Sequence, residues 1–151
     1  DILWRAEFLG HVLDINVVNE RVFVVTHDFD AVTLFVFDEQ TGAQVLALPL
    51  EGPGANGVES TEDPGYMLAN ARIYRSYVLV SFIELSKGLD HFTNIYAVDM
   101  ENRIVRIHSI PATVFLPDDA RGTILGWTQG EEETIFRLYS FTTSGFDISY
   151  E

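Results

Sequence analysis

The chain contains no cysteine among its 151 residues. This absence excludes disulfides, thiolate nucleophiles and zinc sites built from cysteine, and it leaves the compartment open. Basic residues are scarce as well, because 9 Lys and Arg stand against 23 Asp and Glu, for a net charge of −14. A surface this acidic repels phosphate groups. We therefore expect no binding to nucleic acid or to anionic membranes.

Long apolar runs are also missing. The run at 77–83, which contains Ser81, is far shorter than the ~20 residues that a membrane helix needs. Residues 1–7 lack the basic and then apolar pattern of a signal peptide, which slightly favours a cytoplasmic location. The chain does not begin with Met, so a fragment, a processed product and an incomplete sequence all stay open.

A helical pattern of apolar residues cannot be followed beyond about one turn. Alternating strands take its place, most clearly over residues 21–50, which are rich in β-branched and aromatic side chains. Short turns, the first formed by Asn19 and Glu20, separate the strands that this alternation predicts. They cover residues 11–18, 21–27, 32–38 and 43–50. Four neighbouring strands in sequence order form an up-and-down meander.

The same pattern returns twice along the chain. After a loop at 51–65, rich in Gly and Pro, the sequence predicts strands at 66–74, 76–85, 92–99 and 103–110. A third and shorter copy predicts strands at 122–127, 134–141 and 146–150. Residues 34–38 match residues 95–99 at an offset of 61 positions (99 minus 38), which indicates an internal repeat.

These repeats predict an all-β fold of about two to three β-propeller blades within residues 1–151. The blade-like units cover residues 9–50, 66–110 and 122–151. A single β-sandwich or barrel is the alternative. Because propellers close with about four to eight blades, three blades leave two apolar faces open. We therefore expect a larger protein or self-association.

Two segments are similar to the propeller of prolyl oligopeptidase-type serine peptidases. Residues 122–145 resemble its closing blade, with a short strand, an acidic turn and a strand that ends in Ser-Phe-Thr. The other segment is Leu-Phe-Val-Phe-Asp followed by Thr-Gly, at 34–42, a turn that WD-type propellers share. Ser144 stands where the peptidases usually have Pro. The resemblance implies a propeller that gates a separate hydrolase domain and holds no nucleophile.

Residues 52–57 spell the G-x-G-x-x-G pattern of a dinucleotide site. The pattern is followed by three carboxylates and a proline rather than by an amphipathic helix, so we favour a loop. No cofactor is predicted. His27, Asp28 and Asp30 could hold a divalent cation, but the next residues supply no further ligand, and a solvated turn is the favoured interpretation.

The remaining histidines, His11, His91 and His108, do not have metal-ligand spacing. Ser140 and Ser144 lack a nucleophile elbow. The acidic run at 131–133 is typical of a solvated turn. No catalytic residue is therefore predicted for this chain alone.

Aromatic residues are plentiful, with eleven Phe, six Tyr and two Trp. Four of them lie on predicted strands, where we expect them to fill the space between blades. They are Phe35, Phe37, Tyr96 and Phe136. Phe29 and Phe92, in predicted loops, are instead candidates for anchoring a partner.

The function that these patterns favour is a non-catalytic propeller-type module for protein interaction or gating. One alternative is the propeller portion of a prolyl oligopeptidase-family peptidase. The other is a carbohydrate-binding or self-assembling structural β-protein. The acidic surface predicts basic or neutral protein partners or self-association, and a small ligand or glycan stays open.

Overall fold

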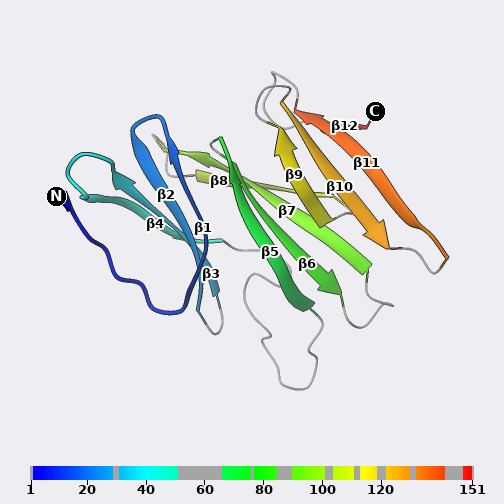
Figure 1. The fold of residues 1–151 in the computed structure, drawn as a ribbon, viewed down its shortest axis with the longest axis horizontal. Helices are drawn as coiled ribbons and strands as arrows, with labels where there is room; N and C mark the ends of the chain where they lie inside the picture. Colours follow the sequence, from blue (N-terminus) through cyan, green and yellow to red (C-terminus); the bar gives the residue numbers. More distant parts are fainter. Residues whose placement is uncertain are drawn as a thin grey trace.

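The computed structural model describes residues 2–28, 31–50, 66–75, 77–84, 90–100, 104–110, 113–118, 122–129, 132–141 and 148–150. These residues form twelve strands and no helix, so the all-β prediction is confirmed (Figure 1). The described residues accordingly include no apolar helix of membrane-spanning length. The strands form three antiparallel sheets of four, and none of the three closes into a barrel.

Sheet I contains the first four strands, hydrogen-bonded in sequence order. They are β1 (His11–Val18), β2 (Arg21–Asp28), β3 (Ala31–Asp38) and β4 (Gln44–Pro49). Asn19 and Glu20 make the tight β1–β2 turn with φ angles of 49° and 61°. Positive φ at both central residues gives the turn a twist that matches the flanking strands. The four strands lie where the sequence predicts them, to within one or two residues.

Sheets II and III repeat this order. Sheet II contains β5 (Tyr66–Tyr74), β6 (Tyr77–Glu84), β7 (Asp90–Asp99) and β8 (Ile104–Ile110). Sheet III contains β9 (Thr113–Asp118), β10 (Thr123–Gln129), β11 (Thr134–Phe141) and β12 (Ile148–Tyr150). Each sheet is therefore a complete four-stranded meander.

Sheet III begins earlier than the sequence predicts. Its first strand is β9, which pairs with β10, whereas the expected third unit started at residue 122 with only three strands. Pro117 led to this error because proline usually marks a turn. In β9, however, proline lies on an edge strand, where a missing N–H need not break the ladder.

The first strand of every sheet bulges at a corresponding position. The residues skipped by the ladder are Leu13 in β1, Ala69 in β5 and Phe115 in β9. A bulge of this kind bends the strand and increases its local twist. The three meanders therefore share a backbone irregularity as well as a strand order.

The sheets stack in chain order, with sheet II in the middle (Figure 1). We call the face turned toward the following sheet the front face and the opposite one the back face. One continuous apolar cluster joins the front of sheet I to the back of sheet II. Its buried members are Phe23, Val25, Val32, Leu34, Val36, Leu46 and Leu50, and then Ala71, Ile73, Val78, Val80, Phe82, Tyr96 and Val98.

A second cluster joins the front of sheet II to the back of sheet III. Leu79 and Ile95 pack there with Ile124 and Tyr139, together with Tyr74. Beside them lies a buried polar pair, in which the Ser81 and Thr93 hydroxyls are 2.7 Å apart. Sheet II is thus buried on both faces, which explains why β6 reads as a nearly continuous apolar run.

The four aromatic residues expected between blades have different surroundings. Tyr96 is buried between sheets I and II, as predicted. Phe35 and Phe37 lie instead on the back of sheet I, on which none of the described sheets packs. Phe136 is 61% exposed, so its placement in a core was wrong. Its strand belongs to the last sheet, and no described segment covers the front face of that sheet.

Candidate functional site

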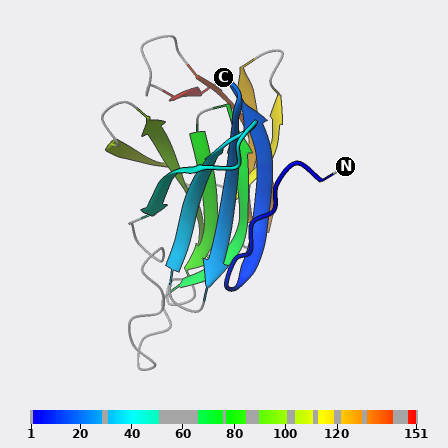
Figure 2. The ribbon, with the colours of Figure 1, turned by 90° about the vertical axis from the view of Figure 1, so that its left-hand side faces the viewer.

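The back face of sheet I is covered by the chain's own N-terminal segment, residues 2–9, which we call the strap. Its backbone runs along the outer side of sheet I (Figure 2), and its inward side chains, Trp4, Ala6 and Phe8, pack on buried residues of β2 and β3. The Phe8 ring lies 5.1 Å from that of Phe35, and the Trp4 ring lies 5.7 Å from that of Phe37. Aromatic pairs at this separation stabilise the fold beyond the contribution of apolar burial alone.

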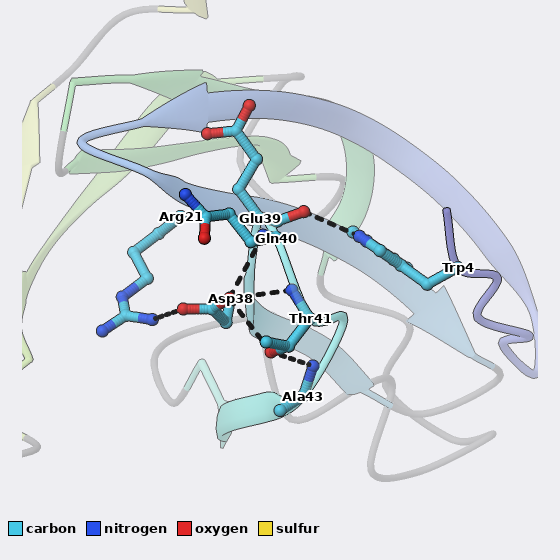
Figure 3. Close-up of polar contacts among 7 residues, drawn as sticks. All are labelled: Trp4, Arg21, Asp38, Glu39, Gln40, Thr41 and Ala43. Carbon is cyan, nitrogen blue, oxygen red and sulfur yellow. Dashed lines mark hydrogen bonds and ion pairs between the residues drawn. The ribbon is translucent and has the colours of Figure 1, made fainter. Parts of the chain in front are cut away.

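Trp4 attaches the strap to the β3–β4 turn. Its indole N–H donates a hydrogen bond of 2.8 Å to the main-chain carbonyl of Glu39 (Figure 3). The indole also packs flat on Gly42, where an added Cβ would lie 2.5 Å from Trp4 Cγ. Gly42 has a φ of 70°, which disfavours other residues on conformational grounds. Both the turn and the indole contact therefore require this glycine.

Asp38 organises the same turn through its carboxylate. One oxygen accepts hydrogen bonds from the Gln40 N–H (3.1 Å), the Thr41 N–H (2.9 Å) and the Thr41 hydroxyl (3.0 Å), and the other accepts from Arg21 at 2.7 Å (Figure 3). The Thr41 bonds, chiefly that of its main-chain N–H, lower the pKa of Asp38 below its usual value, and Gln40 and Arg21 act in the same direction. The turn thus holds Asp38 in its charged form.

A groove of about 440 Å³ lies between the strap and sheet I. Phe8, Phe35 and Phe37 line it with aromatic surface. Thr26, Thr33 and Gln44 add hydrogen-bonding groups. The groove therefore offers both apolar and polar contacts to a ligand.

Two acidic residues, Glu7 and Asp28, are also among those that border the groove, and its lining includes no Lys, Arg or His. Arg5 approaches Glu7 at 3.7 Å, but both side chains are about four-fifths exposed. A surface ion pair of this kind contributes little free energy. An incoming cation could take the place of Arg5 beside Glu7. Aromatic faces next to acidic residues suit Lys and Arg side chains.

The structure brings only part of the predicted cation site into view. His27 and Asp28 lie at the end of β2, and the groove includes Asp28. Phe29 and Asp30 lie outside the described residues. Among those that are described, no group of three His, Asp or Glu could hold a metal ion. The cation site formed by His27, Asp28 and Asp30 stays an untested hypothesis.

None of the other predicted candidates is among the residues that line the groove. Phe92 and His91 belong to β7 rather than to a loop, although their side chains are outside the described part. His11 is opposite His27 in the β1–β2 ladder. His108 is within β8. The structure does not unite these residues with the groove.

Ser140 lies in β11, opposite Thr123 and Ser149, so its cross-strand neighbours offer no general base. Glu132 and Glu133 are exposed just before β11, as a solvated turn would place them. Ser144, Glu131 and the glycine-rich residues 52–57 fall outside the described ranges.

Sequence reasoning missed the strap. The signal was present, because Trp4, Ala6 and Phe8 alternate with Arg5 and Glu7. Period-two alternation marks an extended segment with one apolar face. The segment joins no regular ladder, so this alternation alone does not predict which face of the fold it covers. Comparison of the chain with protein-family models, curated proteins and solved structures gives no match.

Proposed function

We propose that this chain is a non-catalytic protein-interaction module built from β-propeller blades, and that it binds a basic segment of another protein in the strap groove. The observation that carries the proposal is the groove itself, in which two acidic residues border an aromatic wall. The net charge of −14 favours the approach of such a partner from a distance.

The architecture supports the propeller part of the proposal. Three four-stranded meanders follow one another, and each of the first two packs its front face on the back face of the next. The shared bulge in the first strand is what repeated blades would show. Repetition of this kind is typical of propellers, in which each blade buries its faces against its neighbours.

The test measures peptide binding by fluorescence anisotropy. Labelled basic, neutral and acidic peptides of equal length are titrated with the full chain at several salt concentrations. We expect the basic peptide to bind best and to weaken as salt rises, because salt screens exposed charges. Absence of binding, or binding to all three peptides alike, would refute the proposal. Salt-independent binding of a neutral oligosaccharide would favour the carbohydrate-binding alternative.

A charge-matched pair of variants locates the site. Glu7→Gln/Asp28→Asn removes the carboxylates of both acidic groove residues, and Glu132→Gln/Glu133→Gln removes two exposed carboxylates just before β11. Exposed ion pairs contribute about 0.2–1 kcal/mol each, so the loss of two should weaken binding about two- to thirtyfold. The control should change it much less. Equal effects would mean that net charge, and not the groove, drives binding.

A further inference from the structure

The front face of sheet III corresponds to the faces that sheets I and II bury. In each sheet, one residue of the second strand lies opposite the first residue after the bulge in the first strand. The side chain of that second-strand residue points to the front. These residues are Val25 opposite Asp14, Ser81 opposite Asn70, and Leu125 opposite Leu116. Val25 and Ser81 are completely buried by the following sheet. Leu125 is half-buried, since no described sheet follows it.

The centre of this front face is apolar. Ile124 and Tyr139 are buried against sheet II, so their strand neighbours must point to the opposite side. The register sets Leu125 beside Leu138 and Trp127 beside Phe136. Cross-strand partners share a face, so these four side chains form one patch, with Phe136 at its most exposed point. We call it the front patch.

The back face of sheet I is the counterpart of the faces that sheets II and III bury. The strap covers its centre over β2 and β3. On β1 the same face is open, because Ile15 lies opposite Val24 and Val17 lies opposite Val22. Ile15 is 60% exposed and Val17 is 53% exposed. Within the described residues, one chain thus carries at one end a front face on which no sheet packs, and at the other end a strap-covered back face.

We propose that a second copy of this chain docks head to tail, with its sheet I back face on the front patch, and that the strap competes for this interface. The chain already makes a front-to-back interface twice, so a third of the same kind continues an existing stack. A heterologous contact of this type forms rings or open chains of subunits rather than symmetric dimers. The proposal rests on the stacking of sheets and not on the groove.

The strap lowers the apparent affinity, because only molecules with the strap displaced offer a complete back face. A groove ligand needs the strap in place, so peptide binding and association oppose each other. The dependence on salt concentration also distinguishes peptide binding from self-association. Copies that each carry −14 repel one another, and added salt screens this repulsion. Association should strengthen with salt, whereas binding of a basic peptide should weaken.

Sedimentation velocity over a concentration series of the full chain tests the proposal. Trp4→Ala/Phe8→Ala releases the strap and should lower the dissociation constant by about tenfold or more. Phe136→Glu, added to this strap-free variant, should return it to monomer, and Phe136→Leu should not. A strap-free variant that stays monomeric overturns the proposal. Association that Phe136→Glu leaves unchanged also overturns it. Aggregation through the exposed apolar back face alone would not depend on a charge placed on sheet III.

A mixing experiment tests the head-to-tail geometry. In the strap-free background, Phe136→Glu blocks the front patch and Ile15→Glu/Val17→Glu blocks the back face. Each protein alone should be monomeric, and an equal mixture should give a one-to-one dimer. Dimers of either protein alone, or no dimer in the mixture, would refute the geometry. Circular dichroism confirms folding, and Ile15→Ser/Val17→Ser replaces the charged pair if that pair unfolds.

Discussion

The main-chain N–H of Ile73 donates a hydrogen bond of 2.7 Å to the carboxylate of Asp14, which links β5 of sheet II to β1 of sheet I. Asp14 follows the β1 bulge, and the bulge turns its side chain toward the next sheet. Its other oxygen accepts from the N–H of Ile15 at 2.9 Å. Asp14 therefore fixes how the first two sheets meet.

We expect Asp14→Ala to destabilise the protein by about 1–3 kcal/mol, because it leaves the Ile73 N–H without its acceptor. Asp14→Asn keeps an oxygen at this position and should cost less. Urea denaturation of both variants measures the difference. Equal losses for the two would show that the hydrogen bond to Ile73 does not stabilise the junction.

Gly42→Ala should release Trp4 from the β3–β4 turn. An alanine at a φ of 70° costs about 1–2 kcal/mol, and its Cβ would overlap the indole. In a Trp127→Phe background, Trp4 is the single tryptophan, and its fluorescence should shift to the red. Gly122→Ala is the matched control, because its φ is 65° but an added Cβ has no described neighbour closer than 3.8 Å. A similar shift in the control would contradict the predicted overlap.

The carboxylate of Asp38 should make stability depend on acid pH. Its pKa in the folded protein is lowered, chiefly by the Thr41 N–H, so the ionised form favours folding. The contribution is present above the unfolded pKa, near 3.8, and is lost as pH falls through the folded value. Asp38→Asn should therefore unfold at a lower temperature than wild type at pH 7, with the gap closing below about pH 3.8. A gap that does not change with pH would refute this linkage.

Tyr96 should resist ionisation at alkaline pH. Burial raises its pKa to about 12, although Asn94 donates a 3.2 Å hydrogen bond to its hydroxyl. The neutral form favours folding, so its contribution is full below pH 10 and declines as pH rises from 10 toward 12. Tyr96→Phe should flatten this alkaline loss of stability in denaturant titrations. If wild type and variant lose stability in parallel, the phenol does not control the transition.

The strands of sheet I could be predicted from sequence because β-branched and aromatic residues alternate there without interruption. Pairing register was harder to predict. The sequence match aligns Asp38 with Asp99. In the ladders, however, Asp38 lies opposite Arg21, the first residue of β2, and Ala97 lies opposite Tyr77, the first residue of β6. The structural counterpart of Asp38 is therefore Ala97. Side-chain similarity does not report hydrogen-bond register when every second position is apolar.

The groove could not be predicted from local pattern, because the strap and β3 meet only through the tertiary fold. Asp28 appeared as a candidate in the sequence, but for a cation site. Phe35 and Phe37 had the right character for burial, yet no sequence rule shows which face of the first sheet lacks a neighbouring sheet. The exposure of Phe136 has the same origin at the other end of the stack.

The bulges in β1, β5 and β9 have a further consequence for solubility. Each of these strands is an edge of its sheet, where free N–H and C=O groups could pair with another molecule and begin a fibril. A bulge interrupts the regular spacing of these groups, and Pro117 removes one donor from β9. These edges therefore present poor templates for amyloid-like growth, even though most of the described residues are in strands.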